Sequence, residues 1–200
     1  MNHVSQEELY TTTPMGAAVL RMFSTLNETA ALLYPDAEPG SVRAYIFGGA
    51  AVHIYTKARG SRDVDAEIQG ADKLRPQDLV VDYEDEDGEP QLLVWDSNYN
   101  PTLGPLHEDY AEDAILLTQD DEDILWVYIA SADDLAVSKL GRFAEHDRND
   151  IKALAKRGRI NSSSLRVRAE DAFKYYVGNV DSARGSLQLA LNDLEKYEDE

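Results

Sequence analysis

Residues 42–65 read VRAYIFGGAAVHIYTKARGSRDVD, and the architecture of the chain follows from this segment. A run that is apolar except at Arg43 predicts a short buried strand over residues 42–47. Two glycines end that strand, and the apolar residues after them predict a helix over 50–58. After a turn at Gly60, polar and apolar residues alternate over 63–68, which is typical of a strand with one buried face.

The same segment brings two glycines and two carboxylates onto adjacent elements. Gly48 and Gly49 lack side chains, so their backbone N–H groups can approach a polyanion closely where a helix begins and its dipole favours phosphate. Asp63 and Asp65 are two residues apart on the predicted strand, so their side chains leave the same face. Two such carboxylates can hold divalent cations that clamp a triphosphate. Each feature alone is more typical of a turn or a solvated strand, but the joint arrangement indicates a nucleotide site.

The rest of the chain predicts an α+β fold in which strands precede helices. A helix is expected from Pro14 to about Tyr34, with Thr13 as its cap. We expect a core of residues 1–130 built on a mixed sheet with flanking helices, and a C-terminal helical lobe of residues 131–200 packed on it. The other expected strands are 79–83, 91–95, 114–118 and 124–130, and the other expected helices are 131–143, 147–156, 169–177 and 183–197.

Charge is distributed unevenly along the chain. There are 38 acidic residues against 19 Lys and Arg, which gives a net charge of −19. The 63 residues between Arg75 and Lys139 contain no Lys or Arg and hold 18 of the acids, whereas residues 137–168 hold nine bases and three acids. That basic segment is either the solvated surface of helices or an edge for phosphate or RNA on a body that otherwise repels polyanions.

Composition and missing motifs exclude several classes of protein. The chain has no Cys, which excludes disulfide scaffolds, thiol nucleophiles and Cys-ligated zinc. Its four His residues lie at no metal-ligand spacing, and neither a P-loop nor a hydrolase nucleophile elbow is present. No apolar run approaches the length of about 18 residues that indicates a membrane span. The first residues do not resemble a signal peptide, so we expect no membrane association and a cytoplasmic location.

The order of strand, Gly-Gly, helix and Asp-x-Asp strand resembles the DNA polymerase β nucleotidyltransferase superfamily. The block RGSRDVD of residues 59–65 is similar to the Arg-x-Thr/Ser-x-Asp-hydrophobic-Asp block of its small prokaryotic members, which include AbiEii-type and MenT-type toxin nucleotidyltransferases. The segment 134–151 resembles the helical block of AbiEii-like proteins, in which a Lys and an Arg on one helix precede an Asp-x-x-Asp on the next. Its matching residues are Lys139, Arg142, Asp147 and Asp150. The resemblance covers roughly residues 42–160.

The resemblance implies a role for each matched residue. A third catalytic carboxylate is expected from a strand beside Asp65, with Asp96 as the first choice and Asp82 as the second. Ser61 is expected either to support the metal-binding strand or to contact phosphate. The implied set is phosphate binding by Gly48, Gly49, Ser61, Lys139 and Arg142, and catalysis and metal binding by Asp63, Asp65 and Asp96.

The implied activity is a Mg²⁺- or Mn²⁺-dependent transfer of a nucleoside monophosphate from an NTP to a hydroxyl acceptor, either an RNA end or a protein. The resemblance also implies a toxin or defence component with a cognate toxin or antitoxin partner. The alternative is a nucleotidyltransferase-like binding module or antitoxin without turnover, which acts through its acidic surface. The Asp63–Asp65 pair favours the enzyme, and the position of the third carboxylate distinguishes the two hypotheses.

Overall fold

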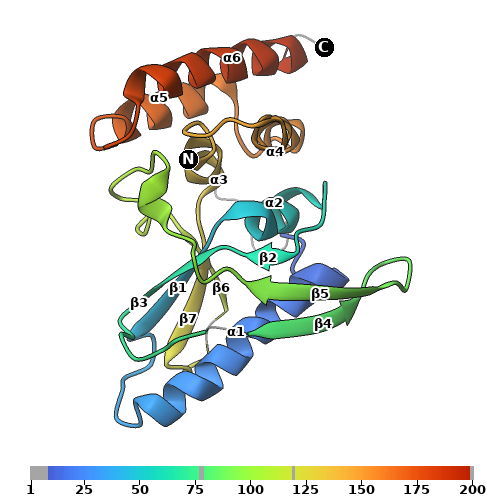
Figure 1. Cartoon of the computed structure of the whole chain (residues 1–200), viewed down its shortest axis with the longest axis vertical. Coiled ribbons are helices and arrows are strands. Elements are labelled where there is room, and N and C mark those ends of the chain that lie inside the picture. Colours follow the sequence, from blue (N-terminus) through green and yellow to red (C-terminus); the bar gives the residue numbers. More distant parts are fainter. Residues whose placement is uncertain (1–8, 77–78, 119, 199–200) are drawn as a thin grey trace. The chain divides into compact units, whose positions relative to one another are not determined.

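We analysed a computed structural model of the chain, which describes residues 9–76, 79–118 and 120–198 (Figure 1). The chain forms two compact units. The first, which we call the sheet unit, runs to Tyr99 and resumes over Ala114–Ile129. The second, the helical unit, takes Asn100–Asp113 and the chain from Ala130 onward. The predicted α+β class is confirmed, because the structure combines two mixed sheets with six α-helices over the described residues.

A four-stranded mixed sheet is built around the predicted apolar strand, which is confirmed. Its strand order is β3-β1-β7-β6, in which β1 runs parallel to β7 and antiparallel to β3. Four of the five β1 side chains are buried, as expected for the central position of an apolar strand. The bounds are β1 Val42–Ile46, β3 Ala66–Gln69, β6 Ile115–Thr118 and β7 Leu125–Ile129.

A three-stranded sheet has the order β2-β5-β4. Its strands β4 and β5 correspond to the strands predicted over 79–83 and 91–95, and together they form an acidic hairpin. β5 pairs antiparallel with β4 and parallel with β2 (Figure 1). The single strand predicted over 63–68 is wrong, because the chain leaves this sheet at Asp65 and continues as β3 in the other one. The Asp65 carbonyl accepts a hydrogen bond from the Phe47 N–H (2.8 Å), which fixes the junction. The bounds are β2 Asp63–Val64, β4 Val80–Glu84 and β5 Pro90–Trp95.

Two helices complete the sheet unit. α1 spans Pro14–Leu33, and Thr13 is its N-cap residue, as predicted. The Thr13 hydroxyl accepts a hydrogen bond from the Gly16 N–H. Its apolar face is buried, and Phe23 meets Trp95 of β5 edge to face at 5.9 Å between ring centroids. α2 (Gly48–Thr56) begins two residues before the predicted start, because both glycines are part of the helix.

The helical unit contains α3 (Ala132–Ser138), α4 (Glu145–Lys156), α5 (Ser162–Ala172) and α6 (Val180–Glu198), with a short 3-10 turn, η2 (Pro101–Leu103). The start predicted at residue 169 is wrong for α5, which begins seven residues earlier. There the Asn161 side chain accepts from the Ser164 N–H, and Ser164 accepts from the Asn161 N–H in return. The end predicted at residue 143 is also wrong, because α3 stops at Ser138 and Phe143 adopts a left-handed backbone conformation.

Bases of the segment 137–168 pair with acids inside the helical unit. The Arg168 guanidinium donates two hydrogen bonds of 2.7 Å to the fully buried Asp134 carboxylate. Arg148 and Lys152 of α4 both pair with Asp193 of α6. These pairs give the basic residues a structural role in joining helices. Among the helices that the structure describes, none combines the length and the apolar character needed to cross a membrane.

Candidate metal and nucleotide site

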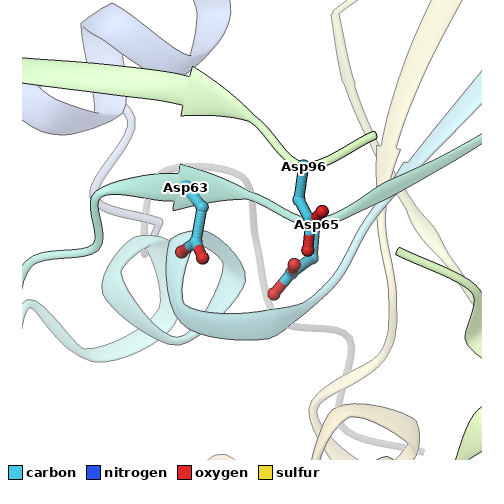
Figure 2. A group of neighbouring side chains, drawn as sticks. All are labelled: Asp63, Asp65 and Asp96. Carbon is cyan, nitrogen blue, oxygen red and sulfur yellow. The ribbon is translucent and has the colours of Figure 1, made fainter. Parts of the chain in front are cut away.

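Three carboxylates converge at the junction of the two sheets. Asp63, Asp65 and Asp96 each offer one oxygen, and these oxygens all lie within 4.8 Å of one another. Figure 2 shows the three side chains directed to the same side of their strands. Oxygen atoms at this spacing can ligate one divalent cation or bridge two. The donors are all carboxylates, so the group suits hard cations such as Mg²⁺ or Mn²⁺.

The strand register explains why Asp96 joins the pair. β2 and β5 run parallel with Asp63 opposite Val94. The Val94 N–H donates to the Arg62 carbonyl (2.9 Å) and the Asp96 N–H donates to the Val64 carbonyl (3.1 Å), so the ladder continues one residue past β5. Asp96 therefore lies beside Asp65. Its carboxylate also accepts from the Asn98 N–H (2.8 Å), a turn that ends the strand.

Asp82, the second choice for the third carboxylate, lies elsewhere. It is on β4, opposite Leu92 of β5, and is not a member of the converging group. Its backbone carbonyl accepts a hydrogen bond from the Arg21 guanidinium of α1 (2.8 Å). The structure therefore brings together the first choice, Asp96, and leaves Asp82 on the strand next to it.

The two glycines leave the space that the site needs. Gly48 has a φ of +60°, and a Cβ there would lie 1.6 Å from Oδ2 of Asp65. A Cβ on Gly49 would lie 2.6 Å from the Ser61 hydroxyl. Gly48 therefore requires glycine for both space and conformation, whereas a side chain at Gly49 would have to displace the Ser61 hydroxyl and the Arg59 guanidinium. The N-cap residue of α2 is Phe47, whose side chain offers the first N–H groups no acceptor, so this helix start beside the carboxylates is suited to an anion.

Ser61 and Arg59 lie at the same helix start. The Ser61 hydroxyl donates to Oδ1 of Asp63 (2.8 Å) and so orients one of the three carboxylates. The Arg59 guanidinium nitrogens lie 2.9 and 3.0 Å from where a Gly49 Cβ would be, which places a permanent cation over the start of α2. Arg59 is not among the site residues predicted above, although it opens the block of residues 59–65 that carries the resemblance.

The loop that carries Arg59 is held by a buried histidine. Nδ1 of His53 lies 2.8 Å from the Arg59 carbonyl oxygen and Nε2 lies 2.8 Å from the Thr13 hydroxyl. His53 is therefore a structural residue that ties the end of α2 to the start of α1.

A cavity of about 570 Å³ opens beside Asp63. Its walls come from the start of α1, the end of α2, the loop before β2 and the tip of the acidic hairpin. Lys57 and Glu86 form an ion pair (2.6 Å) between two of these walls. The lining residues are Thr13, Pro14, Met15, His53, Lys57, Arg59, Gly60, Ser61, Arg62, Asp63, Tyr83, Asp85, Glu86, Asp87 and Gln91.

The matched residues of the helical unit form a separate ion network. The buried Lys139 ammonium lies 2.8 Å from Asp150 and 3.9 Å from Asp147. Arg142 donates two hydrogen bonds of 2.9 Å to Asp147. Burial raises the pKa of Asp147, but the hydrogen bonds from Arg142 and the Ala144 N–H and the charges of Arg142 and Lys139 outweigh burial, so the pKa lies below its ordinary value. Lys139 and Arg142 thus have carboxylate partners within their own unit.

Comparison with known proteins identifies the family. The profile of a family described as "Nucleotidyltransferase of unknown function (DUF6036)" matches residues 21–199, which include the three carboxylates, the two glycines and nearly all of the helical unit. A comparison with curated proteins finds no match. The chain therefore belongs to this family of nucleotidyltransferases.

Proposed function

We propose that the chain transfers a nucleoside monophosphate from an NTP to a hydroxyl acceptor and releases pyrophosphate. The observation that carries this proposal is the convergence of Asp63, Asp65 and Asp96 beside the glycine-opened start of α2. The three carboxylates would hold Mg²⁺ or Mn²⁺. When bound, these ions would offset the phosphate charge and lower the pKa of the attacking hydroxyl.

The chemical step follows from this arrangement. The acceptor oxygen forms a bond to the α-phosphorus, and the bond from that phosphorus to the oxygen bridging to the β-phosphate breaks. Pyrophosphate leaves with the electrons of the broken bond, and the hydroxyl proton passes to the Asp96 carboxylate. The N–H groups at Gly48 and Gly49 and the Arg59 guanidinium hold the outer phosphates, while Ser61 keeps Asp63 in place.

The branch and biological role belong to the proposal too. Similarity of residues 59–65 and 134–151 to AbiEii-type and MenT-type proteins supports a toxin or defence function with a cognate partner. In that proposal Lys139 and Arg142 contact nucleotide phosphates. Because Lys139 pairs with Asp150 and Arg142 pairs with Asp147, phosphate would take the place of a carboxylate partner.

Label transfer tests the proposal. The purified protein is incubated with each α-labelled NTP, Mg²⁺ or Mn²⁺ and a cell extract that contains RNA and protein. Asp63→Asn, Asp65→Asn and Asp96→Asn are compared with Asp36→Asn, a matched control at an exposed carboxylate of the sheet unit outside the converging group. We expect labelled acceptor with the wild type and Asp36→Asn and at least a roughly 100-fold loss with the other three. If none of the NTPs gives a labelled acceptor, the result would contradict the proposal and favour the alternative, a binding module or antitoxin.

A further inference from the structure

One face of the three-stranded sheet leaves aliphatic side chains in solvent. Val80 is 47% exposed, Leu92 is 59% exposed and Val94 is 40% exposed, and we call these three residues the apolar platform. The other face of β5 is buried, where Leu93 and Trp95 pack inside the sheet unit. Exposed aliphatic residues that adjoin one another on a sheet indicate a contact surface more often than isolated ones do.

The register places this platform directly next to the carboxylates. Val80 of β4 faces Val94 of β5, and Val94 faces Asp63 of β2, so the three side chains form one row across the sheet. Neighbouring strands lie about 4.8 Å apart, which makes Val94 the immediate neighbour of Asp63. Alternate residues of a strand share a face, so Leu92, Val94 and Asp96 follow one another along β5 on that same side. A molecule bound on the apolar platform would therefore lie next to the carboxylates of Asp63 and Asp96.

The charges around the platform are acidic. Asp82 faces Leu92, and Glu84 follows on the same side of β4. The strands β2, β4 and β5 contain no Lys or Arg, and Arg21, the base nearest Asp82 on α1, donates to the backbone carbonyl of Asp82. Nucleic acid is bound through Lys and Arg contacts to phosphate and through aromatic stacking on unpaired bases. The platform offers carboxylates and aliphatic side chains instead.

Resting on the proposed function, we propose that the acceptor is a protein segment in which a Ser, Thr or Tyr hydroxyl is flanked by apolar and basic residues. Its apolar side chains pack on Val80, Leu92 and Val94, and its Lys or Arg side chains meet Asp82 and Glu84. The acceptor hydroxyl oxygen then lies at Asp63 and Asp96 and bonds to the α-phosphorus. Pyrophosphate is displaced, and the hydroxyl proton passes to Asp96.

The test compares three acceptors with the full chain and the labelled NTP. The first is a set of synthetic peptides with a central Ser, Thr or Tyr flanked by leucines and lysines. The second is the same set with glutamates in place of the lysines, and the third is total cellular RNA. We expect label in the leucine–lysine peptides at least about tenfold above both other acceptors, and dependent on Asp63.

Platform variants then locate the contact. Val80→Ser combined with Leu92→Ser should raise the KM for the peptide about tenfold and leave the KM for the NTP unchanged. Asp82→Lys should raise the peptide KM as well. The control is Val177→Ser, which removes an aliphatic side chain that is 93% exposed in the helical unit. All four positions are exposed, so thermal unfolding should match the wild type.

The outcomes separate this inference from the proposed function. Label in RNA alone, lost in Asp63→Asn, would overturn the protein acceptor and leave the nucleotidyltransferase intact. If the KM for the peptide is unchanged in the platform variants, the result would overturn the platform as the docking surface. Absence of label from every acceptor, together with no transfer in the extract, would overturn both.

Discussion

Gly48 leaves open the space that the Asp65 carboxylate occupies: a Cβ on the glycine would lie 1.6 Å from a carboxylate oxygen of the aspartate. The start of α2 therefore packs directly against the junction between the two sheets. Any side chain at position 48 would have to displace the Asp65 carboxylate, so the helix start and the carboxylate group depend on each other structurally.

Gly48→Ala should displace the Asp65 carboxylate and weaken Mn²⁺ binding at least about tenfold. The control is Gly88→Ala, because Gly88 also has a positive φ (+80°) but a Cβ there meets nothing within 4 Å. Both variants carry the backbone cost of an L-residue in the left-handed region, about 1 kcal/mol. Isothermal titration with Mn²⁺ distinguishes displacement of the Asp65 carboxylate from the backbone cost that both variants share. Equal Mn²⁺ affinity in the two variants would contradict this account of Gly48.

Ser61→Ala should lower the rate of nucleotidyl transfer about tenfold by freeing Asp63. The lost hydrogen bond is made to a charged group, for which about 1.5 kcal/mol is typical. Ser61→Thr keeps a hydroxyl and should restore most of the rate. Steady-state kinetics check this, and an alanine variant as fast as the threonine variant would argue against a positioning role.

Asp134→Ala should lower the free energy of unfolding by about 3 kcal/mol. The substitution leaves the mostly buried Arg168 guanidinium without the two hydrogen bonds that Asp134 accepts, and its remaining carboxylate partner is the half-exposed Asp113 (2.8 Å). Asp134→Leu combined with Arg168→Met removes both charges and should recover much of the loss. Urea unfolding measures the difference, and a double variant no more stable than Asp134→Ala would contradict this explanation.

The Asp193 ion pairs should make the stability depend on acid pH. The hydrogen bond from Arg148, with support from Lys152 and against the effect of burial, lowers the pKa of Asp193 to about 2. The unfolded value is about 3.9, so the ionised group stabilises the fold above about pH 4, and this contribution is lost as the pH falls toward 2. It amounts to about 2.5 kcal/mol at most.

Asp193→Asn therefore should be less stable than the wild type at pH 6, with a difference that shrinks between pH 4 and pH 2. Urea unfolding across this range measures it. Asp181→Asn, at an exposed position on the same helix, is the control. A stability difference that stays constant with pH would contradict the assignment.

Local sequence was sufficient for the part of the site whose geometry is local. The apolar strand, the glycine pair and the Asp-x-Asp spacing lie within 24 residues, and backbone periodicity alone relates them. The sequence favours Asp96 because this residue directly follows an apolar strand. Choosing it over Asp82 required the parallel register of β2 on β5, which is a pairing between distant segments.

The division at Asp65 could not be read from the sequence. The alternation of polar and apolar residues over 63–68 is the same whether the strand pairs with one neighbour or changes sheets midway. The early start of α5 was readable in principle, since Asn161 and Ser164 have the spacing of a reciprocal cap, but the polar residues after them show no strong apolar face. The partners of Lys139 depend on how α3 and α4 pack, which spacing alone does not give.

The path of the chain through its two units has a practical consequence. The polypeptide passes from one unit to the other after Tyr99, after Asp113 and again after Ile129. Residues 100–113, which we call the excursion, belong to the helical unit. They are anchored there by a hydrogen bond between His107 and Asp171 and an ion pair between Asp113 and Arg168. A fragment truncated at residue 130 would retain this excursion without its anchors, and one proteolytic nick would leave the pieces tethered. Obtaining the sheet unit as one continuous chain therefore requires replacement of residues 100–113 by a short linker.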